Sequence, residues 1–315
     1  MVDKEKIIKD ESPLVMAWIG QDDPLRGDSQ MAVGLAKLCA EMTGGRYVYV
    51  DQKMLEVHFP KAKHYGAREL MALEDFGAPD ILIGVEGIRA YDLMDKKPTV
   101  SVHHIGESLS RKFCRHNMVP HNLSDQILHE EGAKFKKIYP DIKGQLVAVM
   151  LASPVNTGTL TKRLVQLAEH YDDITYFICP GRRALGTERD LEKDFWNAAV
   201  KGEFNPQMDV RCVDYAAIER GNNPYLGLLA NADHVIVAGS SYSMVSDALY
   251  TEKTVHLAGT SILLSELEEK GHIAYIDKLD LSQPFPTQIM PRLDATREVA
   301  EIIVEHYQRG MAVRL

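Results

Sequence analysis

The sequence has few cysteines and no excess of positive charge. Its 315 residues contain four cysteines, and 36 Lys and Arg stand against 45 Asp and Glu, a formal net charge of −9. The cysteines are far apart and show no Cys-x-x-Cys spacing, so we expect buried free thiols in a reducing compartment and no metal site. A negatively charged chain repels a phosphate backbone on average, so we also expect no nucleic-acid partner.

Long apolar runs and common catalytic motifs are also missing. No stretch approaches the roughly 20 apolar residues of a membrane-spanning helix. The segment Met1 to Lys6 carries both signs of charge and resembles neither a signal peptide nor a transit peptide, so we expect a cytoplasmic protein. The absence of G-x-x-x-x-G-K-[ST], G-x-G-x-x-G and G-x-S-x-G motifs argues against P-loop NTPases, common NAD-dependent dehydrogenases and serine hydrolases.

The chain instead alternates short apolar runs with helical patterns. Residues 14–19 form an apolar run that leads through a polar loop into Met31, Leu35 and Leu38 at helical spacing. Further strand-like runs lie at residues 47–50, 80–84, 99–102, 146–151, 176–179 and 234–237. Continuous apolar strands that alternate with helices predict an α/β fold with parallel sheets covered on both faces.

The alternation is repeated in the two halves of the chain. Residues 146–151 restart the strand, loop and helix pattern, and the segment 79–84 is echoed by 232–237. We interpret this as two Rossmann-like domains in tandem, although βαβ units also recur within one large sheet. The predicted domains are residues 1–142 and 143–291, followed by a C-terminal helix over 292–315 that could cross back to the first domain.

A serine-rich loop follows the strand at 234–237. In open parallel sheets, ligands bind beyond the carboxyl ends of the strands. Glycine allows close approach to the backbone, hydroxyls form hydrogen bonds, and a helix start offers unpaired N–H groups, so this loop suits a diphosphate. An ordinary helix cap would explain the serines equally well. The candidate residues here are Ser240, Ser241, Ser243, Met244, Ser246 and Asp247.

Two adjacent arginines, Arg182 and Arg183, follow the strand at 176–179. Guanidinium groups can grip phosphate oxygens with two hydrogen bonds each. The alternative is a solvated turn in which the arginines pair with Glu188 or Asp190.

The third loop contains Asn223 and Tyr225 before a short helical stretch. Asn223 can cap the helix without any ligand, and Tyr225 could stack on a base.

The first half of the chain offers three candidates for acid–base chemistry. Asp28 lies in the loop into the first helix, Glu86 ends a strand, and His104 follows the strand at 99–102. A carboxylate or an imidazole at such a position could accept a proton, although most of the twelve histidines are expected to be structural.

The run from Arg220 to Ala248 strongly resembles the mitochondrial-fission (elongated mitochondria) protein family, whose bacterial members are regarded as candidate glycosyltransferases. The resemblance extends weakly over residues 27–30, 79–83, 119–122 and 181–183.

The resemblance implies a GT-B-like architecture, with two Rossmann-like domains facing across a cleft and a nucleotide-sugar donor held mainly by the second. Ser240, Ser241 and Ser243 match the loop that holds the donor diphosphate. Asp247 occupies the place of the acidic residue that binds the ribose, where the family more often has glutamate.

The implied reaction is transfer of a sugar from a nucleotide-diphosphate donor to a hydroxyl of a glycan or lipid-linked acceptor, in cell-envelope glycan synthesis. Arg182 and Arg183 would stabilise the departing diphosphate, so no metal and no further cofactor is expected. If the reaction inverts the anomeric centre, Asp28, Glu86 or His104 would deprotonate the acceptor.

Two other functions stay open. Plant relatives are associated with mitochondrial division through partner recruitment, so the chain could be a non-catalytic adaptor. The chain could also be a sugar-nucleotide epimerase with the same fold.

A peripheral contact with the inner membrane surface is a further hypothesis. Three lysines lie beside aromatic and apolar residues in the segment 134–139, a pattern that suits anionic lipid headgroups. A solvated linker explains the segment equally well.

Overall fold

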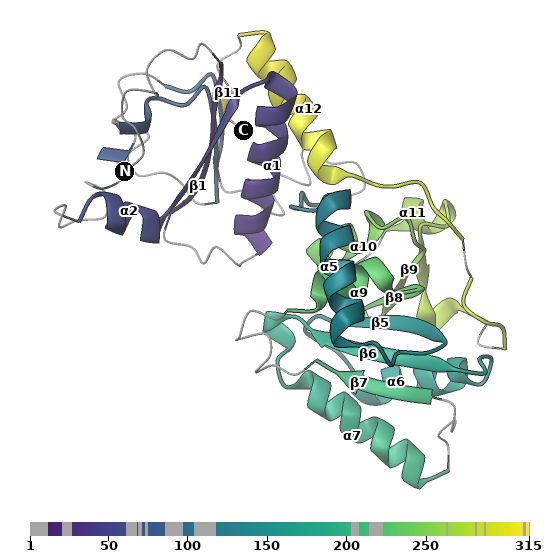
Figure 1. Cartoon of the computed structure of the whole chain (residues 1–315). Helices are drawn as coiled ribbons and strands as arrows, with labels where there is room; N and C mark the ends of the chain where they lie inside the picture. The colour runs from purple at the N-terminus through teal and green to yellow at the C-terminus, as the bar shows by residue number, and fades with distance from the viewer. Residues whose placement is uncertain are drawn as a thin grey trace. The chain divides into compact units, whose positions relative to one another are not determined.

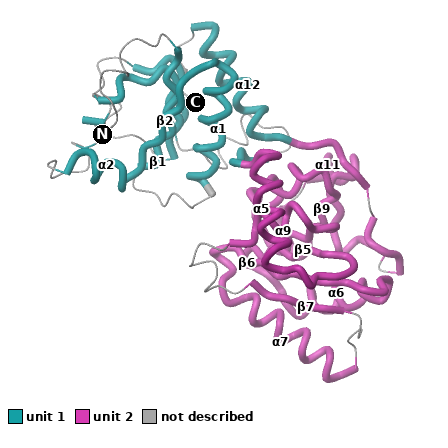
Figure 2. The backbone as a smooth tube through the Cα atoms, in the orientation of Figure 1, with its two compact units in different colours: residues 1–122, 294–315 teal, residues 123–293 magenta. Residues whose placement is uncertain are grey.

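The computed structural model contains two parallel sheets flanked by helices, which confirms the predicted α/β class (Figure 1). It describes residues 12–20, 27–60, 68, 71–72, 75–85, 97–103, 118–202, 208–213, 223–262, 264–280, 282–286, 288–310 and 313–314. The chain divides into two compact units, Met1–Asn122 with Asp294–Leu315 and Leu123–Leu293 (Figure 2).

Unit 1 is built on a parallel sheet with the strand order β11-β4-β3-β1-β2. The central strand β1 is wholly buried, as its unbroken apolar sequence predicts. In chain order the described elements are β1 (Leu14–Gly20), α1 (Gly27–Thr43), β2 (Arg46–Asp51), α2 (Gln52–His58), β3 (Ile81–Gly84), β4 (Val100–Val102), α12 (Ala295–Gln308) and β11 (Val313–Arg314).

Unit 2 is built on a parallel sheet with the order β10-β9-β8-β5-β6-β7. The chain starts in the middle at β5, moves outward to β7, then returns to β8 and moves outward the other way, which is the order of Rossmann sheets. Its elements are α5 (Asp125–Ile138), β5 (Gln145–Leu151), α6 (Thr157–Ala168), β6 (Ile174–Pro180), η4 (Arg182–Ala184), α7 (Thr187–Val200), β7 (Met208–Cys212), α9 (Tyr225–Asn231), β8 (His234–Ala238), α10 (Tyr242–Leu249), β9 (Val255–Ala258), α11 (Ser265–Glu269), β10 (Ile273–Tyr275) and η5 (Ile276–Lys278).

The sequence echo between the two halves has a structural basis. In unit 1, the Asp80 carboxylate accepts a hydrogen bond from the Leu14 backbone N–H at 2.8 Å. In unit 2, Asp233 accepts one from the Leu146 N–H, also at 2.8 Å. Each aspartate therefore joins the start of a later strand to the start of the first strand of its sheet. The two sheets each have this hydrogen bond.

The C-terminal helix α12 belongs to unit 1, which confirms that it returns to the first domain. The Asp294 carboxylate caps it by accepting the Arg297 N–H at 2.9 Å. Thr296 fixes it to the end of the first segment of unit 1, because its hydroxyl donates to the His121 carbonyl at 2.8 Å and accepts the His121 N–H at 2.7 Å.

The division between the units differs from the boundary at 142/143 that the sequence suggested. It falls after Asn122, so that α5 lies in unit 2 and packs against α9. The close approach depends on Gly132 and Gly227, since a Cβ atom on Gly227 would lie 2.6 Å from the Glu131 carbonyl oxygen. Asn231 adds a hydrogen bond to the Gly132 carbonyl at 3.0 Å.

The same packing changes the interpretation of the segment 134–139. Phe135 is 3% exposed, and its ring lies 5.3 Å from that of Phe177. Tyr139 also contacts Phe177, with ring centroids 4.8 Å apart. Phe135 is therefore part of the core, Tyr139 is partly buried beside it, and Ile138 is the exposed apolar residue beside the lysines. Among the described residues, no helix is long and apolar enough to cross a membrane.

Candidate functional site

The loops after β5 and β8 meet at the switch point of the unit 2 sheet. The Ala152 N–H donates to the Ala238 carbonyl at 2.7 Å. Gly239 has a φ of +88°, and a Cβ atom there would overlap the Ala152 carbonyl oxygen, so only glycine fits. The contact brings the starts of α6 and α10 to the same edge of the sheet, where Rossmann folds bind ligands.

The start of α10 carries the predicted serines. Ser241 is the N-cap residue, and its hydroxyl accepts the Met244 N–H at 3.4 Å and lies 3.1 Å from the Ser243 hydroxyl. The Ser240 hydroxyl lies 2.9 Å from that of Ser261 and accepts the Ser261 N–H at 3.1 Å. Hydroxyls from the loops after β8 and β9 therefore gather at one helix start. Sequence reasoning missed Ser261, because only the order of the strands brings the two loops together.

Ser246 does not fit the predicted role. It is 2% exposed, and its hydroxyl donates to the Tyr242 carbonyl at 2.9 Å within the helix. The Ser246 hydroxyl therefore takes part in the helix's own hydrogen bonding, as serine often does in the interior of a helix.

The arginine loop after β6 lies against the first turn of α10. The Gly181 N–H donates to the Leu151 carbonyl at 2.8 Å, and a Cβ atom on Gly181 would lie 2.5 Å from Met244 Cε. Arg182 and Arg183 follow directly, in the short helix η4, and both are exposed. The structure thus places the two arginines on the same edge of the sheet as the serine cluster.

For Arg183, the alternative of an ion-paired turn is weakened by the position of the Glu188 side chain. Its side chain is 7% exposed and accepts the Gly186 N–H at 2.7 Å, at the start of α7. Within the described part of the chain, neither Glu188 nor Asp190 forms an ion pair with Arg183.

Asp247 and Tyr225 form a hydrogen-bonded pair. The Tyr225 hydroxyl donates to Asp247 at 2.8 Å, and the Asn223 side chain accepts the Tyr225 backbone N–H at 3.1 Å. Burial raises the pKa of the Asp247 carboxyl to about 7, against the lowering effect of the tyrosine hydrogen bond. Burial and the neighbouring aspartate raise the pKa of Tyr225 well above its usual value. The Tyr225 hydroxyl is thus hydrogen-bonded to Asp247. The sequence did not predict this hydrogen bond.

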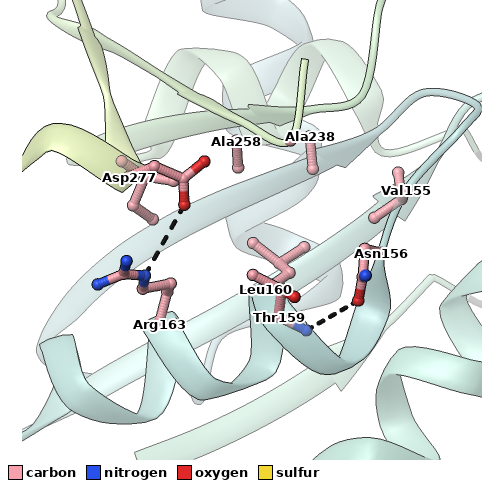
Figure 3. A pocket seen from close by; sticks show the side chains of 10 residues that line it. Val155, Asn156, Thr159, Leu160, Arg163, Ala238, Ala258 and Asp277 are labelled. Carbon is pink, nitrogen blue, oxygen red and sulfur yellow. Dashed lines mark hydrogen bonds and ion pairs between the residues drawn. The ribbon is translucent and has the colours of Figure 1, made fainter.

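A pocket of about 240 Å³ lies beside the start of α6 (Figure 3). Arg163 of α6 and Asp277 of η5 form an ion pair across it, with Nε and Oδ1 3.8 Å apart. Asn156 caps α6 by accepting the Thr159 N–H at 3.0 Å. The lining contains no aromatic side chain and consists of Val155, Asn156, Thr159, Leu160, Arg163, Ala238, Ala258, Gly259, Ile276 and Asp277.

The sequence analysis did not predict the pocket, although one sequence pattern indicates a ligand-binding loop there. In the sequence, the small residues at 152–159 follow a strand, as the serine-rich residues after 234–237 do. Arg163 and Asp277 had no comparable signal, since the fold brings them together from distant positions.

The predicted acid–base residues belong to unit 1. Asp28 lies in the first turn of α1 and is partly buried. Glu86 and His104 lie outside the described residues. In the described ranges, no group of three or more His, Cys, Asp or Glu residues could hold a metal ion.

The sequence profile of a family described as mitochondrial fission ELM1 matches residues 103–307, about two thirds of the chain. No curated protein matches the sequence.

Three solved structures align with nearly the whole chain. A glycosyltransferase from Rickettsia africae is 9% identical with a TM-score of 0.49, covering 96% of this chain and 95% of that one. A family 9 glycosyl transferase from Veillonella parvula is 11% identical with a TM-score of 0.47, covering 96% and 97%. The UDP-GlcNAc 2-epimerase from Neisseria meningitidis, bound to UDP-GlcNAc, is 11% identical with a TM-score of 0.46, covering 94% and 93%.

Proposed function

The chain belongs to the mitochondrial fission ELM1 family, and we propose that it transfers a sugar from a nucleotide-diphosphate donor to a hydroxyl acceptor. The observation that carries the proposal is the meeting of three features at one sheet edge. These are the serine cluster, the start of α10 and the arginine loop.

The donor diphosphate would lie at the start of α10. The first N–H groups of a helix and its dipole favour an anion, and two exposed guanidinium groups at the same edge add charge-assisted hydrogen bonds. Negative charge grows on the diphosphate as the glycosidic bond breaks, so Arg182 and Arg183 would stabilise the transition state more than the bound donor. With this charge in place, the proposed reaction needs no metal ion or further cofactor.

Asp247 would accept hydrogen bonds from the ribose hydroxyls in its ionised form. The Tyr225 hydroxyl already occupies one carboxylate oxygen, so the ribose would use the other or displace the tyrosine. The pKa of about 7 makes this contact dependent on pH near neutrality.

The pocket beside α6 suits the sugar ring better than the base. At about 240 Å³ it is smaller than the roughly 300–1,000 Å³ of sites that enclose whole drug-sized ligands, so it would hold one part of the donor. Its carboxylate, guanidinium and amide groups match sugar hydroxyls, and its lining offers no aromatic ring for a base.

The acceptor is proposed to be a glycan or a lipid-linked hydroxyl compound bound by unit 1. Asp28, Glu86 and His104 remain the candidates for the group that takes its proton. An Asp28→Asn variant that kept full transfer activity would remove Asp28 from this set.

A thermal-shift screen against UDP, GDP, CDP, ADP and their sugars tests the proposal. A ligand at 100 times its Kd adds about 2.7 kcal/mol of stability. We expect one nucleotide class to raise the Tm of the parent and of Lys137→Ala, an exposed cation on α5, and to have little effect on Arg182→Ala or Arg183→Ala.

No shift with any nucleotide would contradict the transferase and favour a non-catalytic adaptor. A shift that the arginine variants keep would show that the diphosphate binds elsewhere.

A further inference from the structure

Helix α7 exposes two large apolar side chains on its outer face. Trp196 is 73% exposed and Val200 is 81% exposed, and they are one helical turn apart. The helix buries the opposite face, which consists of Glu188, Leu191, Phe195 and Ala198. Trp196 and Val200 therefore point away from the core, and they do not lie at the edge of the face that α7 buries. In Figure 1, α7 runs along the β7 end of unit 2.

Two cations continue the same line along the helix. Arg189, Lys193, Trp196 and Val200 are spaced by four, three and four residues, so all four share one face, here called the α7 stripe. Arg189 and Lys193 are exposed, and neither forms an ion pair with a carboxylate in the described part of the chain.

The surroundings of the α7 stripe are basic, although the whole chain carries a net charge of −9. Between residues 182 and 201, the acidic side chains that reach the surface are Asp190 and Glu192, which are exposed, and Asp194, which is partly exposed. The exposed cations of the same segment are Arg182, Arg183, Arg189, Lys193 and Lys201. A positive surface that ends in tryptophan and valine is complementary to a surface with anionic headgroups over an apolar layer.

We propose that the α7 stripe rests on an anionic phospholipid bilayer. Trp196 and Val200 would enter the boundary between headgroups and acyl chains, while Arg189 and Lys193 would contact lipid phosphates. The contact goes beyond the proposed glycosyl transfer and does not depend on it. It also differs from the membrane hypothesis for the segment 134–139, because Phe135 is buried and Tyr139 packs against Phe177.

Vesicle sedimentation of the full chain tests the contact. We expect binding to vesicles of phosphatidylcholine with 30% phosphatidylglycerol, and little binding to phosphatidylcholine alone. Each basic residue near an anionic surface is worth about five-fold in partitioning, so Arg189→Glu/Lys193→Glu should weaken binding at least 25-fold. The matched control Lys136→Glu/Lys137→Glu changes the net charge equally on α5 and should stay within about three-fold of the parent.

Tryptophan fluorescence supplies a second reading on the same vesicles. The chain has two tryptophans, and Trp18 is 2% exposed in the core of unit 1, so a change on binding would report Trp196. We expect a blue shift for the parent and none for Trp196→Ala. The same binding to both vesicle types, an equal loss in both double variants, or vesicle binding without a blue shift would each overturn the proposal. Failure of the parent to bind would overturn it as well.

Discussion

The sheets of the two units begin alike and then diverge. In each sheet, an aspartate, Asp80 or Asp233, ties the buried first strand to a later strand with a 2.8 Å hydrogen bond. In unit 1, β2 lies on one side of β1, and β3, β4 and β11 lie on the other. In unit 2, β6 and β7 lie on one side of β5, and β8, β9 and β10 lie on the other. The same buried first strand and aspartate hydrogen bond therefore occur in two sheets with different strand orders.

Among the described residues, the polar groups of the candidate site gather in unit 2. Two helix starts meet beside the switch point of unit 2, and polar side chains from the loops after β6, β8 and β9 join them. In unit 1, the loop after β1 and the segments with Glu86 and His104 lie outside the described residues, and Asp28 is the described acid–base candidate.

The largest expected effect comes from a matched pair of glycine variants, one in each unit. A Cβ atom on Gly239 would overlap the Ala152 carbonyl in unit 2, and one on Gly34 would overlap the His121 carbonyl in unit 1. Each glycine-to-alanine change should destabilise its own unit by about 2–4 kcal/mol. Hydrogen exchange resolved by segment measures this.

We expect Gly239→Ala to abolish nucleotide binding and Gly34→Ala to leave it unchanged at a temperature where both units stay folded. Loss of protection in both units from either change would contradict the division into two cooperative units.

Acid should destabilise unit 2 through its buried imidazoles. His256 is fully buried, and its ring lies 4.3 Å from Phe285 and 5.9 Å from His234. Burial, with a smaller contribution from His234, lowers the pKa of His256 from 6.5 to about 3. The folded state keeps the ring neutral while the unfolded chain takes up a proton, so stability falls as the pH drops below 6.5 and levels off near 3.

The free energy of unfolding should fall by roughly 1.4 kcal/mol for each pH unit in this range. His256→Phe should remove most of it, which denaturant unfolding at pH 7 and pH 5 would measure. An unchanged pH dependence in this variant would assign the effect to other groups.

Arg183→Ala should weaken nucleotide binding by about 10- to 100-fold, because it removes one charge-assisted contact to the diphosphate. Isothermal titration with the nucleotide selected by thermal shift measures the change. Lys137→Ala is the control and should bind as the parent does. A change of less than two-fold in Arg183→Ala would exclude Arg183 from the site.

The smallest expected effect is the pH dependence set by Asp247. With a pKa of about 7, its carboxyl is mostly protonated at pH 6 and mostly ionised at pH 8. If ribose hydroxyls donate to the ionised form, affinity should rise by up to about ten-fold across this range. The ligand should be a nucleotide sugar, whose diphosphate diester does not titrate there.

Asp247→Asn should give a flat profile, and the exposed Asp190→Asn should keep the profile of the parent. A profile that rises equally in Asp247→Asn would contradict the ribose contact.

Much of the fold could be predicted because strands buried on both faces have unbroken apolar sequences. The β1 and β5 strands, the return of α12 to unit 1 and the start of α10 follow from local sequence. The boundary between the units could not be predicted, since α5 reads as part of the first half until its packing against α9 is known. Ser261, Arg163 and Asp277 could not be assigned, because strand order brings them to the site.

A diphosphate at the start of α10 in unit 2 is the contact on which the proposed function depends. Nuclear magnetic resonance of the ¹⁵N-labelled chain, titrated with the nucleotide selected by thermal shift, tests it most directly. We expect the largest amide shifts at residues 240–244 and 181–183, with loss of these shifts in Arg183→Ala. Largest shifts in unit 1, or at residues 156–159 at the start of α6 with residues 240–244 unmoved, would contradict it.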